Sequence, residues 1–228
     1  MEMNQALKML CEKYSVTATV TIDGCAAIVD GKRLPLLPWR AERRFVEFRN
    51  HVNGAYLKGI STMRVCHIDE AGADLFEILY REIDVCEWIL GAKVCEIFAI
   101  RSDKALNAIA KTDKGYICTL ELAATLAKGA EVIDKHEIIA ETGVICDRVV
   151  DTQVPQSSIY VFGADGKKNT YTDVDSELFG LSIDDCAKVR SAFAIAKDGL
   201  DYTADAAHLD VVIAAAKRSL DTLENVIL

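Results

Sequence analysis

The sequence predicts an α+β fold in which a large, mostly antiparallel sheet is covered on one face by helices. Three observations lead to this class. From residue 94 to about residue 171, β-rich segments alternate with turn residues, which is typical of strands joined by short hairpins. Two amphipathic helical patterns then close the chain. Of the 228 residues, 51% are hydrophobic, so the chain can bury the core of one large domain.

The chain begins with a predicted helix and hairpin. Residues 4–14 carry apolar side chains at helical spacing, and Asn4 is a candidate N-cap. Residues 16–22 and 25–29 are β-rich runs. Asp23-Gly24 between them is a strong hairpin signal, and Asp30-Gly31 closes that hairpin.

Two helices and one strand are expected next. Residues 40–52 form an amphipathic helical pattern, and Gly54 stands where a left-handed C-terminal cap belongs. Residues 60–68 have the β-branched content of a strand. Residues 73–90 form the longest helical pattern of the front half, and Gly91 ends it.

The β-rich part of the chain should supply the sheet. Its predicted strands are residues 94–100, 106–111, 116–122, 131–139, 144–150 and 158–162. Asp113-Lys114-Gly115 and Ala164-Asp165-Gly166 predict hairpin connections, so much of the sheet should be antiparallel.

Two helices should cover this sheet. Ser182 and Asp185 form a capping-box-like start for the first closing helix. The second spans about residues 204–223 and aligns its apolar side chains on one stripe. We expect both helices to pack on the sheet.

Composition narrows the possible partners. The formal net charge is −9, with acidic and basic residues interspersed, so nucleic acid and anionic membranes are poor partners. No segment reaches the roughly 18 uninterrupted apolar residues of a membrane helix. We therefore expect a cytoplasmic protein that binds neither nucleic acid nor membrane.

The cysteines and histidines do not predict a metal site. The 8 cysteines form no C-x-x-C pair, and the 4 histidines are scattered, so we expect free, mostly buried thiols and no bound metal. The sequence also lacks the G-x-G-x-x-G and G-x-x-x-x-G-K-[ST] strings that hold nucleotide phosphates. No cofactor is therefore expected for this chain alone.

One stretch carries a chemical argument. Asp74, Glu77, Arg81, Asp84 and Trp88 follow one another at spacings of three and four residues, which puts them on one helical face. If this stripe faced solvent, it would hold only a Glu77–Arg81 pair worth about 0.2–0.5 kcal/mol.

Residues 72–84 read G-A-D-L-F-E-I-L-Y-R-E-I-D, and Trp88-Ile89-Leu90-Gly91 follows. This stretch resembles a motif of the Gfo/Idh/MocA dehydrogenases, roughly G-G-x-L-x-D-x-G-x-H-x-I-D-x-x-x-W-L-x-G. Further segments are similar to the same family in the same order: Gly115-Tyr116, residues 136–143, residues 211–220 and residues 225–228. The resemblance implies a C-terminal substrate and oligomerisation domain at residues 39–228. It makes residues 1–38 a helix and hairpin left from a nucleotide-binding (Rossmann) domain that is otherwise missing.

The departures from the motif matter for catalysis. The family's aspartate falls on Glu77, its proton-transferring histidine falls on Arg81, and its E-K-P lysine has no counterpart. An arginine, with a pKa above about 12, cannot accept or donate the hydroxyl proton near neutral pH. The catalytic residues are therefore unknown, and the candidates for substrate binding are Glu77, Arg81, Asp84 and Trp88.

Three functions remain open. The first is a non-catalytic domain that forms a homodimer or homotetramer through its open sheet face and binds a sugar, polyol or sugar acid. The second is a subunit or remnant of a sugar or polyol oxidoreductase, which would use NAD or NADP supplied by a separate Rossmann chain. The third is a structural scaffold without a small-molecule ligand.

Overall fold

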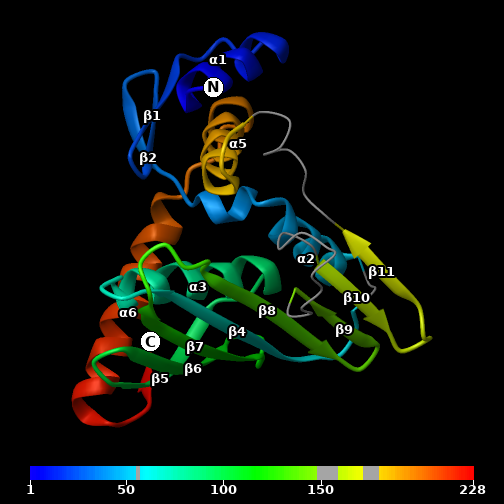
Figure 1. Ribbon diagram of the computed structural model, residues 1–228, viewed down its shortest axis with the longest axis vertical. Helices are drawn as coiled ribbons and strands as arrows, with labels where there is room; N and C mark the ends of the chain where they lie inside the picture. The colour runs from blue at the N-terminus through cyan, green and yellow to red at the C-terminus, as the bar shows by residue number, and fades with distance from the viewer. Residues whose placement is uncertain (55–56, 148–158, 172–179) are drawn as a thin grey trace. The chain divides into compact units, whose positions relative to one another are not determined.

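The computed structural model describes residues 1–54, 57–147, 159–171 and 180–228, and the chain folds into two compact units. Unit 1 consists of Met1–Val46 and Asp173–His208, and unit 2 of Glu47–Thr172 and Leu209–Leu228. The boundaries fall inside two helices, α2 (Arg43–Asn53) and α6 (Thr203–Thr222). Figure 1 labels these elements.

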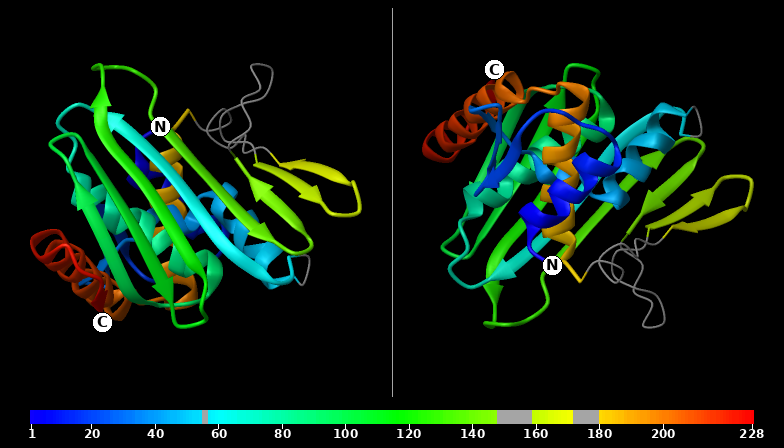
Figure 2. Two further views of the ribbon diagram at one scale, coloured as in Figure 1. Left: turned by 90° about the horizontal axis from the view of Figure 1, so that it is seen from below. Right: turned by 90° about the horizontal axis from the view of Figure 1, so that it is seen from above.

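Unit 1 joins both ends of its sequence around one small core. Its described elements are α1 (Met3–Lys13), β1 (Val20–Asp23), β2 (Ala26–Val29), β3 (Lys32–Pro35), the 3₁₀ helix η1 (Pro38–Ala41) and α5 (Ile183–Asp198). The strands form an antiparallel sheet in the order β1-β2-β3. Buried Leu7 of α1, Ala27 of β2 and Ala192 of α5 belong to the same hydrophobic cluster, and the right panel of Figure 2 shows α1 beside α5.

Asn4 is not the N-cap that the sequence suggested. The helix begins two residues earlier, at Met3, with Glu2 at the N-cap position and no side-chain cap bond. The Asn4 side chain instead binds the backbone of Ile22, accepting from its N–H at 2.8 Å and donating to its carbonyl at 3.3 Å. An amide can do both at once, so Asn4 ties α1 to β1.

The predicted hairpin is a three-stranded meander. Asp23 pairs with Ala26, as expected for a turn at Asp23-Gly24. A second turn at Asp30-Gly31, whose residues have φ of 47° and 81°, leads into β3, which the sequence interpretation missed. Residues 16–19, predicted as strand, lie outside β1.

The prediction that both closing helices pack on the large sheet is wrong for α5. Its start is as expected, because the Ser182 hydroxyl accepts from the Asp185 N–H at 3.1 Å. Its buried stripe, however, belongs to the core of unit 1. An apolar stripe shows that a helix is covered but not by which element.

Unit 2 is built on a mostly antiparallel sheet, which confirms the predicted fold class. Its described strands are β4 (Ile60–Glu70), β5 (Val94–Arg101), β6 (Ala105–Thr112), β7 (Ile117–Leu126), β8 (Ile133–Ala140), β9 (Gly143–Cys146), β10 (Ile159–Gly163), β11 (Lys168–Tyr171) and β12 (Val226–Ile227). Their order is β11-β10-β9-β8-β4-β7-β6-β5-β12, and only the β4–β7 pair is parallel. Residues 148–150 and 158 of two predicted strands lie outside the described residues.

Helices cover one face of this sheet. Helix α3 (Leu75–Leu90) packs across β4, β6 and β7, as Figure 2 shows in its left panel. The C-terminal part of α6 is joined to β5, because the Ser219 hydroxyl accepts from the Ala99 N–H at 3.0 Å. The predicted turns at Asp113-Lys114-Gly115 and Ala164-Asp165-Gly166 connect antiparallel strands.

Two boundary predictions need correction. Helix α2 begins at Arg43 rather than at residue 40, because the 3₁₀ turn of η1 precedes it. Gly54 does not have a left-handed backbone conformation. Its N–H donates to the Asn50 carbonyl at 2.8 Å, which prolongs the helical pattern instead of ending it. No helix in the described residues has the length and apolar character needed to cross a membrane.

Candidate functional site

Helix α3 positions the candidate residues. Asp74 caps its N-terminus by accepting from the Phe76 N–H at 2.8 Å, and Gly91 ends it with a left-handed φ of 58°. Between these ends the helix buries three acidic side chains, Glu82, Asp84 and Glu87. Carboxylates are rarely buried unless they are paired, so the covered face of this helix is chemically unusual.

The four predicted binding residues do not gather in one place. Glu77 is exposed, whereas Asp84 is fully buried. Trp88 is half-buried, and the Arg49 guanidinium carbon lies 4.5 Å from its ring centre. The Arg81 side chain is only 17% exposed and binds Glu82 and Asp134 instead of Glu77.

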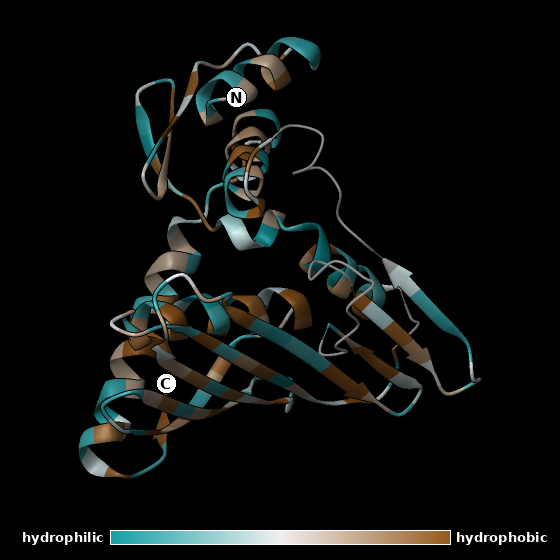
Figure 3. Ribbon diagram, viewed as in Figure 1, coloured by the Kyte–Doolittle hydropathy of each residue, from teal (hydrophilic) through white to brown (hydrophobic). Residues whose placement is uncertain are grey.

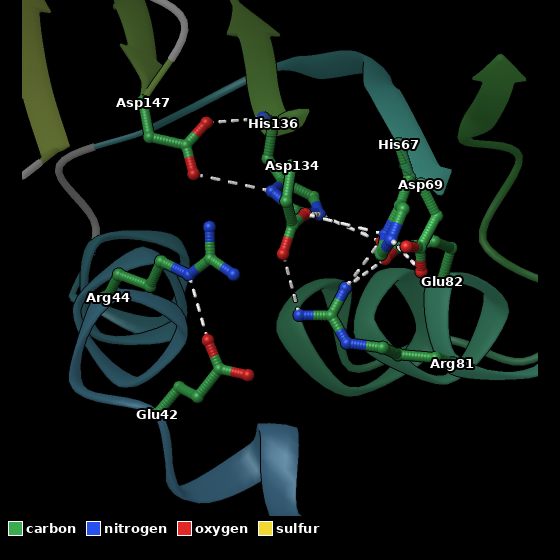
Figure 4. A network of polar contacts seen from close by, with 9 residues as sticks. All are labelled: Glu42, Arg44, His67, Asp69, Arg81, Glu82, Asp134, His136 and Asp147. Atoms are coloured by element: carbon green, nitrogen blue, oxygen red, sulfur yellow. Dashed lines mark hydrogen bonds and ion pairs between the residues drawn. The ribbon is translucent and has the colours of Figure 1, made fainter. Parts of the chain in front are cut away.

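A buried polar network surrounds Arg81. It joins Glu82 of α3 to His67 of β4 and to two residues of β8, Asp134 and His136. Glu82 Oε1 lies 2.8 Å from His67 Nδ1, and Glu82 Oε2 lies 2.8 Å from His136 Nε2 (Figure 4). Arg81 donates through Nη1 to Glu82 and through Nη2 to Asp134 Oδ2, the latter at 2.8 Å.

Each histidine of the network also faces a second carboxylate. His136 Nδ1 lies 3.3 Å from Asp147 Oδ2, and the Asp147 carboxylate also accepts from the His136 backbone N–H. His67 Nε2 lies 3.9 Å from Asp69 Oδ2. Acidic and basic groups therefore alternate along the network, in the order Asp147, His136, Glu82, His67 and Asp69.

The charges of this network shift two pKa values. Burial alone would lower the pKa of His136, but the carboxylates of Asp134, Glu82 and Asp147 outweigh it and raise that pKa to about 9. Burial alone would raise the pKa of Glu82, yet Arg81 and protonated His136 hold it well below its usual range. His136 is thus an imidazolium and Glu82 a carboxylate at neutral pH.

Sequence interpretation missed His67 and His136 because they are far apart along the chain. Strands β4 and β8 are antiparallel neighbours that pair His67 with Asp134. The sequence did contain a signal: His67-x-Asp69 lies on one strand and Asp134-x-His136 on the other. Alternate residues of a strand share a face, so either pattern places an acid and a base side by side.

The arrangement does not suit Arg81 to proton transfer with an alcohol. Arg81, at the position of the expected catalytic histidine, stays protonated. The other groups of the network form charge-assisted hydrogen bonds with one another, which hold both histidines and the carboxylates of Glu82 and Asp147 in fixed positions.

Solved structures share this fold. A levoglucosan dehydrogenase in complex with NADH and levoglucosan matches with a TM-score of 0.68 and 14% identity, over 84% of this chain and 65% of that one. An oxidoreductase domain protein from Kribbella flavida matches with a TM-score of 0.65 and 14% identity, over 84% and 64%. The resemblance to the Gfo/Idh/MocA-type dehydrogenases is confirmed at the level of the fold.

A third structure with this dehydrogenase-like fold is scyllo-inositol dehydrogenase from Lactobacillus casei with bound NAD(H) and scyllo-inositol, at a TM-score of 0.60 and 16% identity, over 84% of this chain and 63% of that one. The chain thus spans less than two thirds of the length of these proteins, which is consistent with their C-terminal domain. No family model matches the sequence, and no curated protein matches it.

Proposed function

We propose that this chain is a non-catalytic, dehydrogenase-like domain that assembles with copies of itself through the open face of the unit 2 sheet. The observation that carries the non-catalytic part is the environment of Arg81. This residue stands where the family's motif has its proton-transferring histidine, and two carboxylates bind its guanidinium. A guanidinium held in this way does not give up a proton near neutral pH.

The assembly part of the proposal rests on the uncovered face of the sheet. Strand pairing places one row of side chains on it: Phe98, Ile109, Thr119, Arg64 and Glu137. The row on the opposite face, which the helices cover, is buried: Ala99, Ala108, Leu120, Val65 and His136. Figure 3 shows hydrophobic and hydrophilic residues alternating along these strands.

The open face has the properties of an interface. Ile100 and Ile109 are each 49% exposed there, and Phe98 and Ile109 line a hollow of about 490 Å³ on it. Isoleucine side chains gathered on a sheet face favour burial by a partner. The face also carries charges of both signs, including an Arg64–Glu137 pair at 3.0 Å.

A second copy of the chain suits this mixed surface. A two-fold interface brings the same patch of both subunits together, so that cations of one can meet anions of the other. We propose a homodimer or homotetramer, located in the cytoplasm.

The second part of the proposal is a small ligand of the sugar, polyol or sugar acid class. Two solved dehydrogenases of similar fold hold scyllo-inositol and levoglucosan. Arginine suits a carboxylate because its planar fork can bind both oxygens, so a sugar acid is the member of this class that Arg81 favours. Glu77, Asp84 and Trp88 stay secondary candidates for this role.

An alternative function has one observation in its favour. The chain corresponds to only part of dehydrogenases that carry NAD(H), so a separate Rossmann chain could supply NAD or NADP and complete an oxidoreductase. The third possibility, a scaffold without ligand, differs from our proposal only in lacking small-molecule binding.

Three measurements test the proposal. Sedimentation equilibrium should give a mass of two or four chains, whereas a monomer at all concentrations would rule out assembly. Titration with NADH and NADPH, followed by fluorescence, should show no saturable binding to the purified chain, and micromolar affinity would overturn the non-catalytic interpretation. A rise in melting temperature with a sugar acid would separate ligand binding from a scaffold.

A further inference from the structure

Three side chains from separate elements of unit 2 converge within the polar network. They are His67 of β4, Glu82 of α3 and Asp134 of β8, and one donor atom from each lies within 4.8 Å of the other two. We propose that these three residues bind a divalent first-row transition metal ion, with Zn²⁺ as the probe of choice. This site does not involve the open sheet face, but it includes the contacts of Arg81, which we also propose as a ligand-binding residue.

The two distances from His67 suit a single ion. Zinc binds imidazole nitrogen and carboxylate oxygen at about 2.0–2.2 Å, so two ligands of one ion are at most about 4.4 Å apart. His67 Nδ1 lies 2.8 Å from Glu82 Oε1 and 3.8 Å from Asp134 Oδ1. One nitrogen and two carboxylate oxygens form a donor set that zinc, iron and manganese accept.

Neighbouring residues hold the ligands in place. His136 Nε2 lies 2.8 Å from Glu82 Oε2, which leaves Oε1 directed at His67 (Figure 4). Arg81 Nη2 holds Asp134 Oδ2 at 2.8 Å. Behind His67, its Nε2 faces Asp69 at 3.9 Å. This contact is too long for a hydrogen bond; if it shortened on metal binding, the carboxylate would fix the ring and raise its basicity.

The contacts of His67 Nδ1 give a second argument. This nitrogen faces the acceptor Glu82 Oε1 at 2.8 Å and the donor Arg81 Nη1 at 3.3 Å. A ring nitrogen either carries a proton or offers a lone pair, so it cannot satisfy both neighbours. A metal ion removes the conflict, because it accepts the lone pair and binds the carboxylate at the same time.

Arg81 is therefore a competitor for the ion. Its Nη1 contacts both Glu82 and His67, at the point where the ion would have to lie. The side chain retains 17% exposure, so it can turn outward when the ion binds. Two carboxylates would then balance the charge of a divalent cation, whereas they now outnumber the single charge of the guanidinium.

The test is zinc binding by the full chain in equilibrium dialysis, with bound metal measured by elemental analysis. We expect one zinc per chain, and Arg81→Met should bind it at least tenfold more tightly because the competing charge is gone. Asp134→Asn and His67→Gln should abolish binding. Arg218→Met is the matched control, since Arg218 lies on α6 and is exposed.

Cobalt identifies the donor atoms. Co²⁺ in this site should give visible absorption without the near-ultraviolet band of cobalt–thiolate coordination, which excludes the eight cysteines. Zinc bound equally by the wild type and Asp134→Asn would overturn the proposal, as would the absence of stoichiometric zinc from both the wild type and Arg81→Met. If Arg81→Met does not fold, the comparison of the wild type with Asp134→Asn and His67→Gln decides.

Discussion

Glu82 and His136 form a fully buried pair in which Glu82 Oε2 lies 2.8 Å from His136 Nε2. The pair connects helix α3 to strand β8, two elements that are distant in the sequence. Charges removed from water are tolerated only when each has its partner. The stability of unit 2 should therefore be unusually sensitive to either residue.

We predict that Glu82→Gln lowers the free energy of unfolding by about 3–5 kcal/mol, because it leaves the buried charges of Arg81 and His136 without their common carboxylate. Urea denaturation followed by circular dichroism measures this change. Glu137→Gln is the control, because its partly exposed pair with Arg64 should contribute less than about 1 kcal/mol. Equal losses in the two variants would contradict the assigned role of Glu82.

Stability should fall as the pH rises above neutrality. The pKa of His136 is raised from its ordinary value of 6.5 to about 9 in the folded chain, so its stabilising charge is fully present below about pH 6.5. That contribution, on the order of 3 kcal/mol, is lost as the pH approaches 9. Unfolding curves at several pH values check this.

His136→Gln isolates the effect of the histidine. Buried Cys86 also destabilises the fold at high pH, because a hydrogen bond with Cys118 and burial raise its pKa, and the unfolded chain therefore loses the thiol proton first. The difference between the wild type and His136→Gln removes this contribution. A difference that stays constant from pH 6 to about pH 9 would show that folding does not raise the pKa of His136.

At low pH the dependence of stability on pH has the opposite sign. The folded-state pKa of Glu82 is depressed, so its contribution is present above the ordinary value of 4.5 and is lost as the pH falls below it. We predict that acid destabilises the wild type more steeply than Glu82→Gln. Parallel acid-unfolding curves for the two proteins would argue against this assignment.

The proposed assembly predicts that Ile109→Lys shifts the oligomer to monomers. A lysine in place of half-exposed Ile109 would bring a charge into the apolar part of the open face in any symmetric interface. Light scattering coupled to size exclusion measures the mass. Val211→Lys on α6, at a position with 56% exposure, should leave the mass unchanged. An oligomer retained by Ile109→Lys would place the interface elsewhere.

Replacement of Asn4 should lower the stability of the fold more than replacement of an exposed residue in a first helical turn usually does. Asn4→Ala leaves the backbone groups of Ile22 without this side-chain partner, at a cost of about 1–3 kcal/mol. Asn4→Asp keeps an acceptor for the Ile22 N–H and should lose less. Denaturation of both variants tests this order, and the reverse order would contradict it.

Local patterns predicted most of the elements. Seven strand segments from residue 60 onward and the helix ended by Gly91 have clear signals, because side-chain alternation and turn residues lie within a few positions of one another. The same reasoning failed for Asn4, whose partner Ile22 lies on another element. A short polar side chain near a helix start can cap the helix or bind elsewhere, and sequence spacing does not separate the two.

The candidate site could be predicted only in part. Helical periodicity singled out Arg81, and the resemblance to the family motif aligned it with the proton-transferring histidine. The partners of Arg81 could not be found in this way, since Asp134 comes from a strand 53 residues later and Glu82 is its immediate neighbour. The side chains of adjacent helical residues usually point in different directions. A rule based on spacing therefore pairs Arg81 with Glu77 instead of Glu82.

The place of β4 in the sheet has a consequence for how the chain reaches its native state. This strand lies between β7 and β8, so Thr62 must meet Ile117, 55 residues later, and Arg64 must meet Glu137, 73 residues later. Closing such long loops costs entropy before the contacts formed can repay it. Hairpins such as β5–β6 and β6–β7 can form early from nearby residues, whereas insertion of β4 should come late and limit the refolding rate.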